Sequence, residues 1–165
     1  MPTPSERVRR PMVYEGTQLS GPKAYGNIRF KEVSLSNAEI KALRAAPKGL
    51  VDAPGSGKLV ELVDAILLLD AGANVLTESA DNLEIRYVGK ASGVVSTIES
   101  TGFIDAAADC FSRAKVAQDL VTTKANSEGL GLELFNNGDG EFAGNAAADA
   151  TLRVKVWYRV VLTGW

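Results

Sequence analysis

The sequence predicts an all-β protein: a β-sandwich, with the jelly roll as the leading candidate, that has one short helix and an extended N-terminal arm. Three observations support this fold class. The 165 residues suit one compact domain, and a composition of 45% apolar and 23% charged residues is typical of globular proteins. Apolar and polar residues alternate with a period of two over several segments. Turn-forming residues separate these segments, which gives about seven or eight strands.

The closing strand has the clearest pattern. Leu152, Val154 and Val156 alternate with Arg153 and Lys155, and the same alternation continues to residue 160. Earlier strands are expected over residues 28–33, 59–70, 83–87, 94–99 and 130–134. The segment 103–127 is counted as one more strand, although 106–110 could equally begin a helix. The glycine-rich segments 54–57 and 136–140 are interpreted as hairpin turns.

One short helix is expected after the first strand. Ser36 and Glu39 have the spacing of a capping box, in which each side chain accepts a hydrogen bond from the backbone N–H of the other residue. Ile40 and Leu43 lie three residues apart and so share one face. Pro47 ends the element, which limits it to about two to three turns.

The N-terminal region, residues 1–27, differs in composition from the sandwich domain expected over 28–165. It contains four of the six prolines, which favour extended backbone and remove hydrogen-bond donors. Such a segment is either a tail without structure or an arm that becomes ordered against a neighbouring subunit. The second interpretation makes its basic and apolar residues candidate partner contacts: Arg7, Arg9, Arg10, Met12, Val13 and Tyr14.

Composition excludes several classes of function. The chain has no histidine and one cysteine, so it cannot form a Ser-His-Asp triad, a histidine-containing zinc site or an internal disulfide. The net charge of -2 makes nucleic acid an unexpected partner. No apolar run is long enough to cross a bilayer, and the first residues do not resemble a secretory signal. We therefore expect a non-enzymatic protein without a cofactor, made in a cytoplasm, that binds neither nucleic acid nor membrane.

Four segments or residue sets could form functional sites, and each also has a simpler structural interpretation. The segment 53–58 superficially resembles a phosphate-binding loop but lacks its first glycine and its Ser or Thr after the lysine, so a turn is expected there. An improvised calcium site remains an alternative to a plain turn for the loop that carries Asn137, Asp139, Glu141 and Asp149. Cys110 is expected to be a small apolar side chain rather than a nucleophile.

A glycosidase pair drawn from Asp64, Asp70, Asp81, Glu84, Glu99 and Asp105 is the fourth possibility, although solvated charges at strand ends are the simpler interpretation. An aromatic sugar-binding face was also considered, formed by Trp157, Trp165, Tyr87, Tyr158 and Phe142. Among these, Trp157 lies opposite the apolar face of the last strand. We expect it to pack beneath the N-terminal arm or to lie in a subunit interface.

The order of these elements resembles a group of small β-rich bacteriophage virion proteins, over residues 37–163. The resemblance is carried by turn and strand patterns rather than by catalytic signatures. The segments concerned are 40–47, 50–58, 67–72, 81–87, 99–105, 137–142 and 152–161.

The resemblance implies a capsid decoration, or cement, protein. Such a protein would be a homo-oligomer, with a trimer as the leading expectation, and its partner would be the major capsid protein. It would be located on the capsid surface of the virion and assembled in the host cytoplasm. A tail or head-fibre module is the main alternative, and a carbohydrate-binding module is a third.

Overall fold

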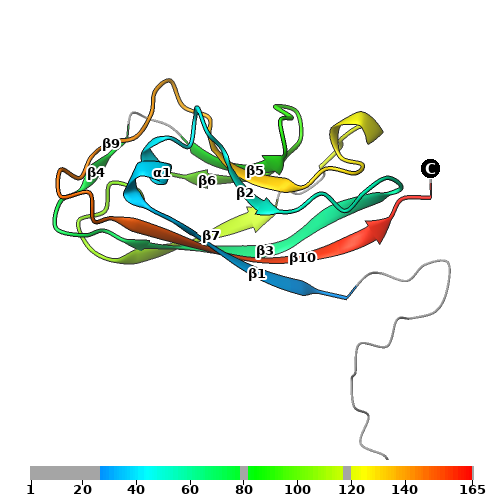
Figure 1. The fold of residues 1–165 in the computed structure, drawn as a ribbon, viewed down its shortest axis with the longest axis horizontal. Coiled ribbons are helices and arrows are strands. Elements are labelled where there is room, and N and C mark those ends of the chain that lie inside the picture. The colour runs from blue at the N-terminus through cyan, green and yellow to red at the C-terminus, as the bar shows by residue number, and fades with distance from the viewer. Residues whose placement is uncertain (1–26, 79–81, 117–119, 165) are drawn as a thin grey trace, which may run out of the picture.

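The computed structural model describes residues 27–78, 82–116 and 120–164. Within these residues eight strands form one antiparallel sheet in the order β1-β10-β3-β7-β6-β5-β8-β2, folded over into two layers (Figure 1). The first layer contains β1 (Arg29–Leu35), β10 (Thr151–Leu162), β3 (Lys58–Asp70) and β7 (Cys110–Val116). The second contains β2 (Lys48–Val51), β8 (Leu132–Asn136), β5 (Asn82–Tyr87) and β6 (Val94–Glu99).

This strand order is that of a jelly roll, so the predicted all-β sandwich and its leading topology are confirmed. The short strands β4 (Leu76–Thr77) and β9 (Ala143–Gly144) pair with each other at one end of the sandwich. The other elements are the helix α1 (Asn37–Lys41) and the 3-10 turn η1 (Lys124–Asn126).

The two layers are joined along one edge and nearly closed along the other. At the joined edge β6 and β7 pair through Ser96 with Val116 and Thr97 with Lys115. At the opposite edge the outer strands β1 and β2 lie close together, and Lys31 Nζ lies 3.2 Å from Asp52 Oδ2. The sheet therefore covers its core on all sides except the two ends of the sandwich.

Alternation along the strands builds that core. In β10 the side chains of Leu152, Val154 and Val156 are fully buried. In β5 the predicted residues Leu83, Ile85 and Tyr87 face inward from the other layer. Burying one such aliphatic side chain stabilises the fold by roughly 1.5–3 kcal/mol, so packing between the layers dominates the energetics.

A β-bulge keeps the long strand β3 in phase with the core. Trp157 of β10 lies opposite Asp64, whereas the next residue, Tyr158, lies opposite Leu62, so Val63 is an extra residue in β3. The insertion changes which alternate positions face inward. As a result Leu62 and Ala65 are both buried, although they are three positions apart rather than two or four.

The helix begins as its sequence predicts. Ser36 is the N-cap of α1, its Oγ accepts a hydrogen bond from Glu39 N at 3.4 Å, and Glu39 Oε2 accepts one from Ser36 N at 2.9 Å. The helix itself covers five residues before turns take over. Its buried residue Ile40, with Leu43 in the turn that follows, closes one end of the core.

Two predicted hairpin turns are wrong. The loop 52–57 leads from β2 in one layer to β3 in the other, and the loop 137–150 leads from β8 to β10 in the same way. Both segments do contain tight turns, with Gly55 and Gly57 at positive φ. In a jelly roll, however, each of these connections crosses between the layers, so the strands that flank it do not pair. The uncertain segment 103–127 contains β7, which confirms that it contributes one strand.

Candidate interaction surfaces

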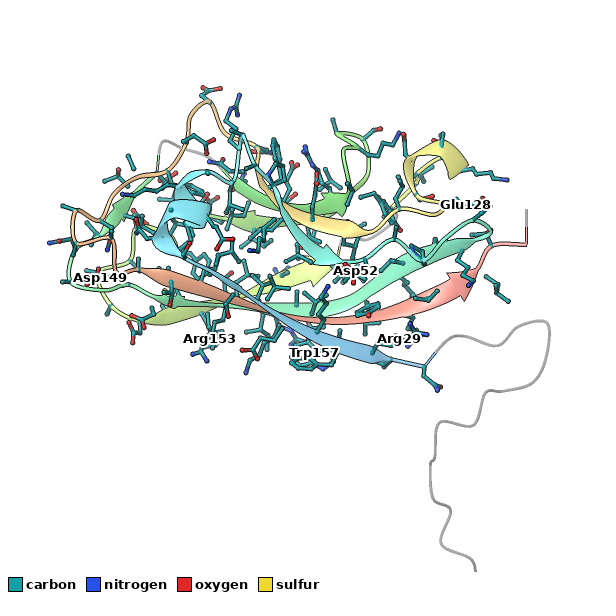
Figure 2. All side chains as sticks on the ribbon, in the orientation of Figure 1. Arg29, Asp52, Glu128, Asp149, Arg153 and Trp157 are labelled. Carbon is teal, nitrogen blue, oxygen red and sulfur yellow. The ribbon has the colours of Figure 1, made fainter. Side chains whose placement is uncertain are left out.

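The outer side of the first layer carries an exposed apolar patch, which we call the Trp157 face. Its members are Phe30, Trp157, Ile66, Leu68 and Phe111, which alternate with the core residues of β1, β10, β3 and β7. The register places Phe30 beside Trp157 and Leu68 beside Phe111. Figure 2 shows Trp157 and Arg153 pointing away from the sandwich interior.

Two of the three aromatic members of this face are exposed, and Trp157 is half-buried. Phe30 is 53% exposed and Phe111 is 70% exposed. The rings of Phe30 and Trp157 are tilted at 47° with centroids 5.3 Å apart, a geometry that stabilises aromatic pairs by about 0.5–1.5 kcal/mol beyond their burial. The pair is thus preorganised on the surface by strand register.

Ion pairs lie among the apolar residues of this face. Arg113 donates from Nε and Nη2 to the two oxygens of Asp64, at 3.1 and 2.8 Å. This contact raises the pKa of the Arg113 guanidinium. Lys155 lies 3.9 Å from Glu32, across β10 and β1. Paired charges therefore lie among the apolar residues, since the register puts Ile66 between Lys155 and Arg113.

A shallow hollow of about 270 Å³ lies at the Phe111 side of this face, lined in part by Arg153, Asp70 and Asp109. Cys110 also borders it. Burial, with the negative charge of Asp109 second, raises the pKa of the Cys110 thiol, and the thiol donates to Phe103 O at 3.7 Å. The environment therefore opposes formation of a thiolate nucleophile.

Acidic side chains gather at one end of the sandwich, which we call the acidic end. It consists of the segments 36–47, 71–78, 100–109 and 137–150, which include α1, β4 and β9 (Figure 1). These segments of the described chain contain seven acidic and two basic residues. Several carboxylates hold the loops together; Glu141, for example, accepts hydrogen bonds from the backbone N–H groups of Arg44 and Ala45 at 3.0 and 2.7 Å.

A buried asparagine organises the acidic end. Asn145 is 1% exposed and has a positive φ of 40°. Its Oδ1 accepts from Asn37 Nδ2 at 3.0 Å, and its Nδ2 donates to Asp149 Oδ1 at 3.0 Å and to the carbonyl of Asn74. Asp149 also accepts from Ala73 N at 2.9 Å, and these bonds lower the pKa of its carboxyl. The asparagine thereby links α1, the loop before β4 and the start of β10.

The opposite end, which we call the terminal end, is apolar and not acidic. It consists of the described segments 27–28, 52–57, 88–93, 120–131 and 163–164, with the strand ends beside them. The loops contain two acidic and two basic residues, and Arg29 and Lys58 add positive charge where β1 and β3 begin. Six of the nine exposed large hydrophobic residues in the described chain lie here: Ile28, Val88, Val116, Leu120, Val121 and Leu162.

The described members of the carboxylate set considered for a catalytic pair have separate partners. Asp64 binds Arg113, Asp70 accepts from Gly72 N at 3.3 Å, and Glu99 accepts from Thr101 N at 3.2 Å. Glu84 accepts from Asn137 Nδ2, and Asp105 accepts from Gly102 N. Asp81 lies outside the described residues. The bonds of Asp70, Glu99 and Asp105 are local turn contacts, which supports the structural interpretation of these three residues.

The alternative of an aromatic sugar-binding face is contradicted for two of its members. Tyr87 and Phe142 are buried in the core, at 3% and 2% exposure, and Tyr158 packs against it. Trp165 lies outside the described residues. Of the four described members, Trp157 alone is on an outer face, where its neighbour is Phe30, a residue not singled out from the sequence.

The side chains of the loop considered as a calcium site bind different partners instead of converging on one point. Glu141 binds the turn after α1, Asp149 binds Asn145 and Ala73, and Asn137 reaches Glu84. In the parts of the chain that the structure describes, no three acidic or cysteine side chains are placed to share a metal ion. Likewise, no helix among the described residues is long and apolar enough to span a bilayer.

The arm residues predicted as partner contacts, from Arg7 to Tyr14, lie outside the described residues. Phe30, Phe111 and Asn145 were missed. An alternation analysis extended to the outward positions of β1 and β7 would have found the two phenylalanines. No sequence signal marks Asn145, because its partners come from segments far apart in the chain.

Comparisons with known proteins find one weak structural likeness and no sequence match. No family model matches the chain, and no curated protein matches it. A chain described as "Cyanophage Pam1 capsid asymmetric unit" matches with a TM-score of 0.47 and 18% identity, over 84% of this chain and 89% of that one. A likeness of this size carries no argument about function, so the proposal that follows depends on the surfaces described above and on the sequence resemblance.

Proposed function

We propose that this chain is a bacteriophage capsid decoration protein, which binds the outer surface of the assembled head and stabilises it by bridging capsid subunits. Its partners would be the major capsid protein and further copies of itself, with a trimer as the simplest closed assembly. No bond would be made or broken. Binding energy distributed over many identical sites would hold the shell against internal pressure.

The observation that supports the proposal most directly is the Trp157 face. A jelly roll needs to bury only the inward positions of its strands, yet Ile66, Leu68 and Trp157 add apolar residues to the outward positions. Apolar side chains gathered on an outer face are typical of interaction sites. We assign this face to contact between copies, because the ion pairs within it leave little net charge to select a different partner.

The proposal is tested with purified protein and with preformed empty heads that lack it. We expect the wild-type protein to be an oligomer by light scattering and to bind heads to a fixed stoichiometry. Decorated heads should withstand higher temperatures than bare ones. A strictly monomeric protein that never occurs in purified virions would refute the proposal.

The contact between copies is tested by Phe30→Ser combined with Phe111→Ser, with Val75→Ser as the matched control. The first variant should shift the protein toward monomers, and the control should not, because Val75 lies at the acidic end. Immunogold label confined to the tail would favour the tail-module alternative, and specific binding on a glycan array would favour the carbohydrate-binding alternative.

A further inference from the structure

Asn137 is the one asparagine, among the eight in the chain, that is followed by a glycine. An asparagine side chain deamidates when the backbone nitrogen of the next residue attacks the side-chain amide carbon. A following glycine favours this attack, because it has no side chain to obstruct the nitrogen and its backbone bends freely. Asn137 is also exposed in the loop that follows β8. Sequence and exposure together mark it as the position where deamidation is expected first.

Two hydrogen bonds hold the reacting groups away from each other. The nucleophile would be Gly138 N, which donates to Asn136 Oδ1 at 2.8 Å in a buried turn. The amide to be attacked belongs to Asn137, whose Nδ2 donates to Glu84 Oε1 on β5. Attack needs a Gly138 nitrogen that has lost its proton and an Asn137 side chain that turns back onto the backbone. Both hydrogen bonds must therefore break before the reaction can begin.

The sheet anchors both protecting groups. Asn136 is the last residue of β8, is 0% exposed, and donates from Nδ2 to Gly140 O at 3.0 Å. A bond that its Oδ1 accepts from the N–H two residues ahead is the geometry of an Asx turn. Glu84 belongs to β5, which pairs with β8 through Leu83 and Asn136. The two bonds thus connect the start of the loop to a regular part of the sheet.

We propose that Asn137 is a deamidation site that the folded protein keeps closed, with Asn136 and Glu84 as the two residues that protect it. In the reaction Gly138 N gives up its proton and bonds to Asn137 Cγ, and the amide nitrogen takes up a proton and leaves as ammonia. Water then opens the resulting cyclic imide and leaves aspartate or isoaspartate at position 137. One water is consumed and one ammonia is released, so no oxidant or other co-reactant is needed. This inference is independent of the proposed function.

The product could not restore the folded contact. A carboxylate at position 137 has no hydrogen to donate and lies against the carboxylate of Glu84, so like charges repel where a hydrogen bond existed. The loop that starts here, 137–150, carries Glu141, which binds the turn after α1, and Asn145, which binds α1 itself. A brief opening of the loop would thereby become a permanent loosening of the acidic end.

Peptide mapping by mass spectrometry measures the rate, because it locates the mass gain at position 137 during incubation at mildly alkaline pH. Two pairs of variants separate the two hydrogen bonds. Glu84→Ala removes the acceptor for the Asn137 amide, and Glu84→Gln is its control because glutamine keeps an acceptor oxygen. Asn136→Ala removes the acceptor for Gly138 N and Asn136→Asp keeps it, while both lose the donor to Gly140. Circular dichroism checks the fold of each variant.

Folded wild-type protein should deamidate at position 137 at least about tenfold more slowly than the chain unfolded in guanidinium chloride, since the protecting bonds must break first. Each alanine variant should react about tenfold faster than its control. Amide hydrogen exchange adds a measurement that needs no variant, because the Gly138 N–H should be protected in the wild-type protein. Equal rates in the folded and unfolded chains, a Gly138 N–H that exchanges freely, or alanine variants no faster than their controls would each overturn the inference.

Global unfolding is the other route to the same product, and Val154→Ala tests it. Val154 is fully buried in β10, so its truncation destabilises the whole fold while both hydrogen bonds remain. If the two bonds protect Asn137 locally, Val154→Ala should change the rate by less than about twofold and Glu84→Ala by about tenfold. If Val154→Ala accelerates the reaction as much as Glu84→Ala does, deamidation proceeds through global unfolding and the inference fails.

Discussion

The hydroxyl of Tyr87 joins the two layers of the sandwich, and removing it should destabilise the protein in a pH-dependent way. Tyr87 belongs to β5 of the second layer, and its hydroxyl donates to Val60 O of β3 in the first layer at 2.8 Å. Among the described residues β7 pairs with β3 only from Ala65 to Leu69, so no described strand flanks β3 on that side at Val60. Tyr87→Phe would leave the Val60 carbonyl buried without this donor, at a cost of about 1–3 kcal/mol.

The pH dependence follows from the same burial. Burial, with the charge of Glu61 second, raises the pKa of Tyr87 from 10.0 to about 12. Between these values the unfolded chain releases a proton that the folded protein keeps, so the stability contributed by this group is full below pH 10 and is lost as pH rises toward 12. Allowing for solvent screening, the difference between wild type and Tyr87→Phe should shrink by about 1–2 kcal/mol over this range.

Urea unfolding followed by circular dichroism at a series of pH values measures this difference, and tyrosinate absorbance reports the titration directly. Tyr158→Phe is the matched control, since Tyr158 is a half-buried tyrosine of the closing strand. It should change the free energy of unfolding by less than about 0.5 kcal/mol. A difference between wild type and Tyr87→Phe that stays constant from neutral pH to pH 12 would refute the reasoning.

Three further predictions concern the acidic end and the N-terminal region. The Lys48 ammonium, with the Ser36 N–H second, lowers the pKa of Glu39 from 4.5 to about 2. The Glu39 carboxylate therefore stabilises the fold above pH 4.5, and this stabilisation is lost as pH falls toward 2. Acid unfolding of Glu39→Gln should lack this loss of stability, and added salt should weaken it in the wild-type protein. Asn145→Ala should lower the free energy of unfolding in urea by about 2–4 kcal/mol, because several buried groups lose their partner. A decrease below about 0.5 kcal/mol would show that the loops do not depend on Asn145. Deleting residues 2–26 should leave the sandwich folded but weaken attachment to heads; a truncated protein that unfolds with its oligomeric state unchanged would place these residues in the core instead.

The features that sequence predicted correctly depend on neighbouring residues. Alternation located β3, β5, β6, β8 and β10, and the Ser36 capping box located the start of α1. These signals are local because a strand or helix end is decided within a few residues. They also sufficed for the sandwich, since alternating strands can bury their apolar side only against another layer.

The features that sequence missed depend on distant partners. The turns at 54–57 and 136–140 have hairpin chemistry, but which strands pair is decided by the global topology. The pairing of Phe30 with Trp157 requires the register of the first and last strands. Asn145 bonds the side chain of Asn37 and backbone groups of Ala71 and Asp149, and no pattern around position 145 signals that role.

The position of β10 between β1 and β3 sets the time at which this protein can fold during synthesis. The ribosome makes β1 and β3 early, but they have no direct ladder with each other and must wait for a strand that ends at residue 162. Until then both present unpaired edges, and β3 exposes its Ile66–Leu69 run. Folding is therefore expected to be post-translational and slow for this chain length, with nascent chains prone to aggregate. A truncated product cannot form the first layer, so a chain that stops short of β10 would not form a Trp157 face able to enter an assembly.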